Sequence, residues 1–304
     1  MKIVICGGTG FIGKALTDYL LRQQSEQSHR IIIVTRTQPK HAIHHPQLEY
    51  MTWDQIHNNP SLLEGMDAFV NLAGASLSQL WTRQAKRRII QSRMKTVSTV
   101  ATLIASLERK PPVVIQASAI AIYGTSLHET FDETKSPRVQ DFPSDVVDQW
   151  ENAADNIQNV RLVKLRVSVV LGNGGGAFPM MKLPYILGVG GKIGSGQQWM
   201  SWIHIHDIVR LIEFCILNLD IEGPVNASSP EPVTNDQFGR TVGAVYRRPH
   251  WFPIPSLVLR TLVGELSLIL LQGQRVIPKT ALDHGFIFTY PQLKSALEEL
   301  KSST

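Results

Sequence analysis

The chain has 304 residues, of which 43% are hydrophobic and 18% charged, and its formal net charge at pH 7 is +5. This length fits one large domain or two modest ones with a sizeable core, and the composition excludes a disordered or fibrous chain. The basic residues form no recognised nucleic-acid-binding motif, so we expect no nucleic-acid partner.

In chain order, the first half of the sequence alternates strands and helices. Residues 2–6 form a short apolar strand, and residues 11–22 carry apolar side chains at helical spacing. Similar patterns predict strands at 30–35, 68–72, 112–117 and 160–170, and helices at 81–107 and 144–156, the last opened by Ser144 as a cap. The alternation predicts an α/β fold built on a Rossmann-type doubly wound parallel sheet.

Beyond residue 170 the sequence is rich in glycine and proline clusters, which are typical of loops and short elements. We therefore expect residues 1–170 to form the Rossmann domain, with a return segment at about 200–220 where a strand leads into a helix. Residues 171–199 and 221–304 would form a smaller, irregular α+β lobe on the substrate side.

The remaining sequence features concern the cellular compartment. Cys6 and Cys215 lie in apolar runs and give no disulfide or zinc pattern, so we expect a cytoplasmic protein without a metal site. From the amino-terminal residues we expect no signal peptide. The apolar segment 254–273 is interrupted by Arg260 and Glu265, which predicts a core helix and no membrane partner.

A glycine loop follows the first predicted strand directly. Glycines at these positions allow a tight turn and let backbone N–H groups approach a pyrophosphate, while the next helix contributes its positive end. The sequence GGTGFIG therefore predicts a dinucleotide site formed by Gly7, Thr9, Gly10, Phe11, Ile12 and Gly13.

The second predicted strand bears on the choice of cofactor. It ends Val34-Thr35-Arg36-Thr37, without the carboxylate that would bind the adenosine ribose hydroxyls of NAD. Arg36 can pair with a 2′-phosphate through its planar fork and stack on adenine. We therefore expect NADP rather than NAD.

Several motifs occur in the order GGTGFIG, NLAGAS, SAIAIYG and LRVSVVLG. In this order they resemble the extended short-chain dehydrogenase/reductase superfamily, over nearly the whole chain. With SRMKT, GSGQQWMSWIHIHD and PKTALDHGFIFTYPQLKSAL, the chain more narrowly resembles the "epimerase family" branch, related to NAD(P)-dependent epimerases and dehydratases. The superfamily includes nucleotide-sugar epimerases, dehydratases and carbonyl reductases, and the resemblance implies a Rossmann domain with a substrate lobe.

The resemblance also implies positions around the cofactor. It places Trp53 and Asp54 near adenine, Ser118 near the nicotinamide end, and Arg93 on a helix facing the cofactor. A solvated helix face is the alternative for Arg93. Leu72, Ala73 and Gly74 would lie beside the cofactor's ribose and pyrophosphate.

The superfamily's proton chemistry uses a serine and a tyrosine-lysine pair spaced by four residues, which a helix places on one face. The helix predicted at 144–156 contains neither a tyrosine nor a lysine, and Ala119 stands at the serine position. Tyr123, with its hydroxyl facing the substrate cleft, Ser118 and Glu151 are the candidate substitutes for acid-base work.

A second polar group consists of His204, His206 and Asp207. The two histidines alternate along a predicted strand and would share a face. We interpret the group as a hydrogen-bond cluster on the substrate side or between domains, with ordinary structure as the alternative. A metal site would need a further well-spaced ligand.

Three functions fit these features. The first is an NADP-dependent oxidoreductase or sugar-nucleotide epimerase-like enzyme with a non-standard active site and an unidentified small-molecule substrate. The second is a non-catalytic NADP(H)-binding redox sensor or regulatory protein. The third is an interaction protein that keeps the cofactor for stability. The sequence allows a homodimer and does not name the substrate.

Overall fold

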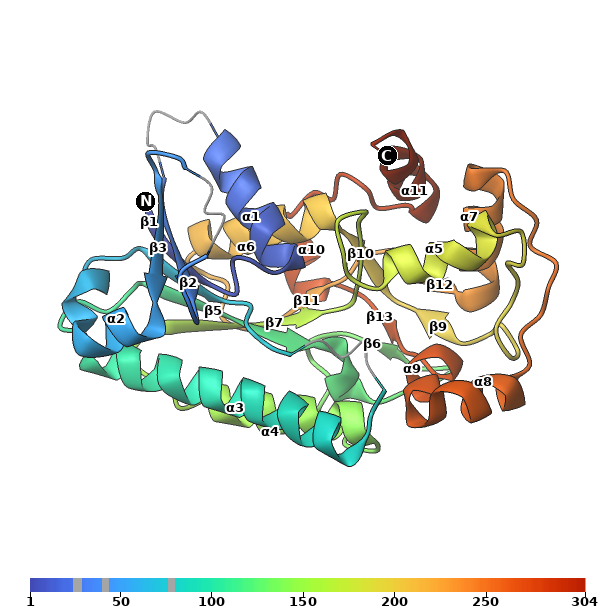
Figure 1. The fold of residues 1–304 in the computed structure, drawn as a ribbon, viewed down its shortest axis with the longest axis horizontal. Coiled ribbons are helices and arrows are strands. Elements are labelled where there is room, and N and C mark those ends of the chain that lie inside the picture. Colours follow the sequence, from blue (N-terminus) through green and yellow to red (C-terminus); the bar gives the residue numbers. More distant parts are fainter. Residues whose placement is uncertain (24–28, 40–43, 76–79, 304) are drawn as a thin grey trace.

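The computed structural model describes residues 1–23, 29–39, 44–75 and 80–303. A seven-stranded parallel sheet lies at its centre, with the strand order β11-β7-β5-β4-β1-β2-β3 (Figure 1). Its strands are β1 (Lys2–Cys6), β2 (Arg30–Thr35), β3 (Leu48–Thr52), β4 (Ala68–Asn71), β5 (Val113–Ala119), β7 (Arg161–Val167) and β11 (Gly223–Ala227). The strand order reverses between β1 and β4, so the sheet is doubly wound and the predicted Rossmann-type fold is confirmed.

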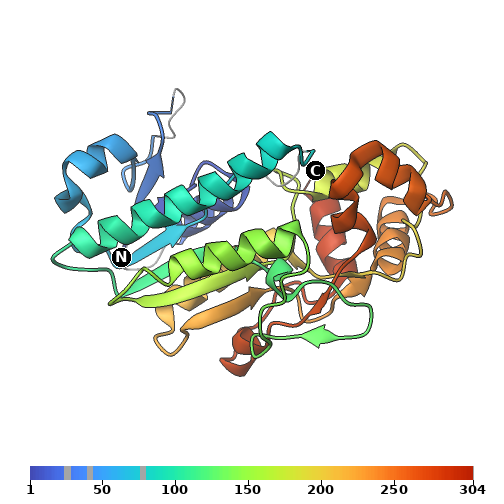
Figure 2. The ribbon, with the colours of Figure 1, turned by 90° about the horizontal axis from the view of Figure 1, so that it is seen from below.

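Helices cover both faces of this sheet. On one face lie α1 (Phe11–Arg22) and α6 (Ile205–Leu217), and on the other lie α2 (Trp53–Asn58), α3 (Arg83–Ser106) and α4 (Phe142–Ala154). Figure 1 shows α3 and α4 below the sheet, and Figure 2, which is seen from below, shows them side by side in front of it. Successive strand residues point to opposite faces, so Ile3 and Ile5 pack toward α1 while Val4 packs toward α3.

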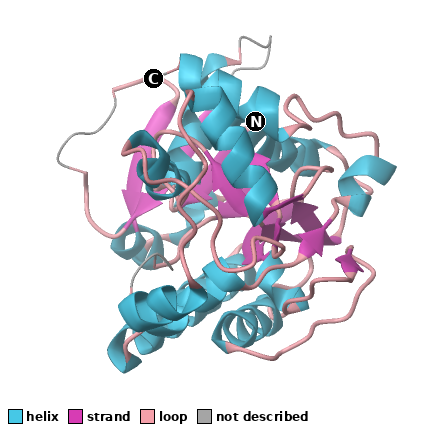
Figure 3. Cartoon of the chain, turned by 90° about the vertical axis from the view of Figure 1, so that its right-hand side faces the viewer, coloured by secondary structure: helices cyan, strands magenta, loops and turns pink. Residues whose placement is uncertain are grey.

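The second lobe is built from short strands and helices. Figure 3 shows the molecule from the side on which this lobe lies. Three two-stranded pairings occur in the described residues: β8 (Val169–Leu171) with β10 (Trp202–His204), β9 (Trp199–Met200) with β12 (Val233–Thr234), and β13 (Arg275–Val276) with β6 (Thr130–Phe131). The helices are α5 (Phe178–Ile186), α7 (Asn235–Tyr246), α8 (Ser256–Val263), α9 (Ser267–Leu271), α10 (Lys279–Asp283) and α11 (Leu293–Ser302). Short 3₁₀ turns lie at η1 (Pro60–Leu63), η2 (Ile120–Tyr123) and η3 (Gly264–Leu266).

The structure corrects several predicted elements. The run at 160–170 is two strands, since the chain leaves the main sheet at Ser168 and β8 pairs with β10 instead. β11 joins the main sheet, so the chain that builds this sheet extends beyond the predicted return segment at 200–220. Helix α4 begins at Phe142, because Asp141 is its N-cap and Ser144, the third helical residue, completes the capping box.

The apolar segment 254–273 is not the predicted core helix. It forms α8, η3 and α9, and two of its apolar side chains are exposed, Leu257 at 71% and Val258 at 43%. Gly264 has φ +57°, a left-handed conformation that ends α8. None of the helices in the described ranges is long and apolar enough to cross a membrane.

Candidate cofactor site and active site

The glycine loop and α1 form an anion-binding turn. Gly7 has φ +82°, and the Gly10 N–H donates to the Gly7 carbonyl over 2.9 Å. A Cβ atom at Gly13 would lie 2.2 Å from Gly7 O, so the helix approaches the loop more closely than any side chain allows. Helix α1 starts at Phe11 without a side-chain cap or an acidic residue in its first turn. Its first N–H groups are therefore available to a phosphate.

The chain after β4 lies directly behind this turn. A Cβ atom at Gly7 would lie 2.9 Å from the Ala73 nitrogen. Asn71, which is fully buried at the end of β4, accepts from the Ala73 N–H over 3.2 Å and donates to Gln116 over 2.8 Å. Sequence reasoning missed Asn71 and Gln116, although polar residues inside apolar strands were the available signal. Ser76, the last residue of NLAGAS, lies outside the described residues.

The predicted adenosine end lies at the adjacent strands. Thr35 pairs in register with Thr52, so Arg36 and Trp53 follow the same edge of the sheet. Arg36 is exposed and makes no hydrogen bond or ion pair with the described part of the chain. Asp54 is exposed in the first turn of α2. None of the described residues therefore occupies the guanidinium of Arg36.

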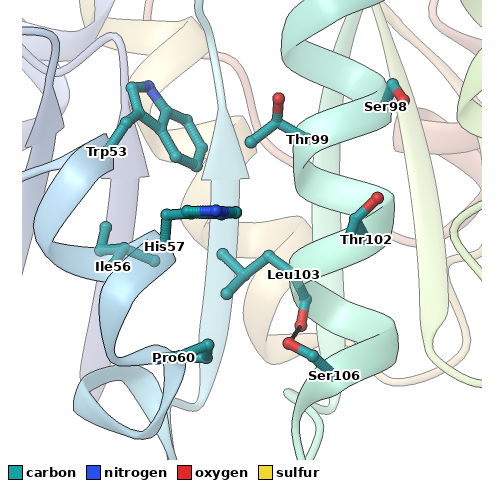
Figure 4. Close-up of a pocket in the computed structure, with 9 residues that line it drawn as sticks. All are labelled: Trp53, Ile56, His57, Pro60, Ser98, Thr99, Thr102, Leu103 and Ser106. Atoms are coloured by element: carbon teal, nitrogen blue, oxygen red, sulfur yellow. Dashed lines mark hydrogen bonds between the residues drawn. The ribbon is translucent and has the colours of Figure 1, made fainter.

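A groove of about 410 Å³ lies between α2 and α3 (Figure 4). In the figure, the His57 ring projects from α2 toward α3. The lining residues are Trp53, Ile56, His57, Pro60, Ser98, Thr99, Thr102, Leu103 and Ser106. Of the predicted site residues, the groove therefore involves Trp53 alone, and none of the predicted catalytic residues lines it.

Arg93 is 6% exposed, so the solvated-face alternative for it is wrong. Its Nη1 donates to the carbonyls of Ala75 and Ile89, both over 3.2 Å, and its guanidinium carbon lies 4.8 Å from the ring centre of Trp150. The neighbouring Ser92 hydroxyl accepts from the Ala75 N–H over 3.2 Å. Ser92 and Arg93 of the SRMKT segment therefore bind the backbone N–H and the carbonyl of Ala75. Ala75 follows Leu72, Ala73 and Gly74, which were predicted to lie beside the cofactor.

The three candidate catalytic residues belong to one buried hydrogen-bond network. The Ser118 hydroxyl donates to Glu151 over 2.5 Å. Arg166 donates to both carboxylate oxygens of Glu151 over 2.8 Å, and to the Tyr123 hydroxyl over 2.8 Å. The Tyr123 hydroxyl in turn donates to Asn226 Oδ1 over 2.9 Å. Arg166, which sequence reasoning missed, is therefore the centre of the network.

The sheet explains why these residues meet. Ser118, Arg166 and Asn226 stand opposite one another in the register of β5, β7 and β11, so their side chains share one face. That face is covered by α4, which carries Glu151. The polar side chains of Arg166 and Asn226, within the strand sequences RLVKLRV and GPVNA, were the signal that could have revealed them.

The predicted orientation of Tyr123 is wrong. Its side chain is 0% exposed, because η2 turns the ring back against Phe131 instead of into a cleft. Burial raises the pKa of Tyr123 to about 12, although Arg166 opposes the shift. Burial lowers the pKa of Arg166, but hydrogen bonds and charge from Glu151 and Tyr123 outweigh it and raise that pKa above its ordinary value. Arg166 therefore stays charged at neutral pH.

The second polar cluster differs from its predicted geometry. His204 ends β10 and caps α6, while His206 lies in the first turn of α6, so they do not share a strand face. His204 Nδ1 accepts from the His206 N–H over 3.2 Å, and its Nε2 lies 2.9 Å from Glu299. Burial lowers the pKa of His204 to about 4, so the ring is neutral at pH 7 and donates from Nε2.

Asp207 shows what the cluster does. It is fully buried and accepts from the backbone N–H groups of Thr289 and Tyr290 over 2.8 and 2.9 Å. The cluster therefore joins α6 to the carboxyl-terminal segment. Within the described ranges no group of three His, Cys, Asp or Glu side chains could hold a metal ion.

Comparisons with known proteins agree with this architecture. Residues 3–227 match the model of the NAD dependent epimerase/dehydratase family, and residues 254–300 match a domain of unknown function, DUF1731. The epimerase family protein YfhF of Bacillus subtilis (strain 168) is 40% identical over 99% of this chain and 98% of its own length.

Two solved structures are similar in both sequence and fold. The human epimerase family protein SDR39U1 (isoform 2), crystallised with NADPH, has a TM-score of 0.89 and 34% identity, with 100% of each chain covered. A nucleoside-diphosphate sugar epimerase of Corynebacterium glutamicum has a TM-score of 0.77 and 28% identity, covering 99% of this chain and 58% of that one.

Proposed function

We infer that this chain, which belongs to the NAD dependent epimerase/dehydratase family, is an NADP-dependent oxidoreductase or epimerase-like enzyme with a small-molecule substrate. The observation that carries the inference is the Ser118–Glu151 hydrogen bond near the carboxyl end of β5, where doubly wound sheets bind their ligands. Ser118 and Glu151 could act as acid-base groups in place of the superfamily's tyrosine-lysine pair, since Glu151 lies on the helix that would carry that pair.

The cofactor proposal rests on the residues around the glycine loop. The N–H groups at the start of α1 would hold the pyrophosphate, and Arg36 would pair with the 2′-phosphate. The presence of NADPH in the similar human structure supports this choice. We expect NADPH to bind at least about tenfold tighter than NADH, a difference of about 1.4 kcal/mol. Calorimetry on the wild type and on Arg36→Ala tests this, since the variant should lose the preference.

The proposed proton path uses Ser118 and Glu151. NADP, when bound, supplies the hydride acceptor for an alcohol substrate. As the substrate hydroxyl gives its proton to Ser118 Oγ, Ser118 gives its own proton to Glu151, and the reverse sequence serves a carbonyl substrate. Arg166 orients Glu151 by a bidentate contact, and Tyr123 helps hold Arg166.

Turnover tests the enzymatic proposal. NADPH oxidation would be followed with a panel of aldehydes, ketones and sugar nucleotides, using wild type, Ser118→Ala and Glu151→Gln. Asp148→Asn is the matched control, because it removes another carboxylate from α4, whose side-chain hydrogen bond within the described residues is with the exposed Asn152 alone. Both site variants should lose turnover and keep NADPH binding, while the control keeps both.

A redox sensor or regulatory protein is the second candidate. The absence of tyrosine and lysine from α4 and the full burial of Tyr123 favour it. It predicts NADPH binding without turnover of any panel compound, together with a protease cleavage pattern that differs between the NADP⁺ and NADPH complexes. An enzyme requires no such difference.

A further inference from the structure

Arg93 is a buried cation without a counter-charge in the described part of the chain. Its side chain makes no ion pair there, and burial, the one cause of its shift, lowers the pKa of Arg93 to about 10. Arg166, the other arginine buried at this end of the sheet, is paired with Glu151 over 2.8 Å. An uncompensated buried charge is unfavourable unless a partner supplies the opposite charge.

The free donors of Arg93 point to where such a partner would lie. Nη1 is used by the Ala75 and Ile89 carbonyls, whereas Nε and Nη2 have no acceptor among the described residues. A Cβ atom at Gly74 would lie 3.4 Å from the guanidinium carbon and 3.5 Å from Nη2. Gly74 is exposed and has no side chain, so it leaves this side of the guanidinium uncovered.

We propose that Arg93 binds an oxyanion, a carboxylate or a phosphate, that the substrate presents at the Gly74 loop. The planar fork of arginine suits both groups, because two parallel N–H donors meet two oxygens. Trp150 supports the guanidinium, whose carbon lies over the Trp150 ring at 4.8 Å from its centre. The proposal deepens the proposed function and rests on it, since it gives the substrate of that site an anionic group.

Thermal unfolding tests the site without requiring turnover. Protein saturated with NADPH would be titrated with inorganic phosphate or acetate at constant ionic strength set by sodium chloride. A ligand of the folded state raises the melting temperature with concentration. We expect such a rise for the wild type, an apparent Kd at least about tenfold weaker for Arg93→Gln, and partial recovery in Arg93→Lys.

The same titration distinguishes the source of the oxyanion. If phosphate stabilises the protein alone but not its NADPH complex, Arg93 holds a cofactor phosphate and the substrate proposal is overturned. An equal response of wild type and Arg93→Gln overturns the site itself. If Arg93→Gln does not fold, Gly74→Val serves instead, because its side chain would lie against the Arg93 guanidinium and should abolish the response. A negative result here leaves the NADPH turnover test unaffected, and the reverse also holds.

Discussion

Ser118 on β5 donates its hydroxyl hydrogen to Glu151 on α4 over 2.5 Å, across 33 positions of sequence. Both side chains are buried, at 4% and 6% exposure. Hydrogen bonds to an ionised acceptor are short and strong in such surroundings. The contact exists because α4 packs on the face of the sheet where Ser118 and Arg166 stand side by side.

Glu151→Gln should destabilise the fold strongly. The variant leaves the Arg166 guanidinium buried without its counter-charge, and breaking a buried ion pair in this way costs about 3–5 kcal/mol. Urea denaturation followed by circular dichroism measures the effect, with Asp148→Asn as the control. A decrease in the free energy of unfolding of less than about 1 kcal/mol would show that another group compensates the charge of Arg166.

Tyr123→Phe should affect stability rather than catalysis. The change leaves Asn226 Oδ1 and one Arg166 donor without their partner, which costs about 1–3 kcal/mol in a buried site. NADPH affinity and turnover should stay within about threefold of wild type, a barrier change below 1 kcal/mol. A loss of turnover in a stably folded variant would restore Tyr123 as the proton donor.

Two alanine substitutions in the glycine loop should separate binding from folding. At Gly10 the nearest atom to a Cβ is Gly7 O at 3.2 Å, so Gly10→Ala should fold but obstruct the pyrophosphate, weakening NADPH at least about tenfold. At Gly13 a Cβ would lie 2.2 Å from Gly7 O, so Gly13→Ala should destabilise the protein by about 1–3 kcal/mol. Calorimetry measures the loss of NADPH affinity in Gly10→Ala, and urea denaturation measures the loss of stability in Gly13→Ala. If folded Gly10→Ala binds NADPH as tightly as wild type, the pyrophosphate does not bind at the glycine loop.

Acid should loosen the contact between α6 and the carboxyl-terminal segment. The folded pKa of His204, about 4, lies below the unfolded value of about 6.5, so the unfolded chain binds the extra proton first. This contribution, of order 2–3 kcal/mol, is present above about pH 6.5 and is lost as pH falls toward 4. His204→Asn, which keeps a capping side chain, should flatten this part of the stability profile. The exposed His128→Asn is the control, and an unchanged slope in His204→Asn would contradict the assignment.

The sequence predicted the Rossmann half well for a physical reason. Strands buried on both faces read as continuous apolar runs, and β1 and β2 are such runs. β3 and β11 were not predicted, because LEYMT is largely half-exposed and GPVNA contains a glycine and a proline. Their places in the sheet come from packing and register, which no local pattern encodes.

The candidate site was also predictable only in part. The glycine loop is a local sequence pattern, so its residues could be named from their spacing. The partners of Ser118 and Glu151 could not, because Arg166 meets them only through the order of β5 and β7 and the placement of α4. The orientation of Tyr123 was predicted wrongly because β5 is followed by a 3₁₀ turn, which the apolar sequence IAIY does not indicate.

The most direct measurement is the transfer of deuterium from NADPH labelled at the reactive carbon of its nicotinamide ring. We expect wild-type protein to place deuterium on carbon in at least one reduced carbonyl compound of the panel. Ser118→Ala should bind labelled NADPH equally well and transfer no deuterium. If wild-type protein saturated with NADPH transfers deuterium to none of the compounds, or if Ser118→Ala transfers it at the wild-type rate, the proposed enzyme mechanism is contradicted.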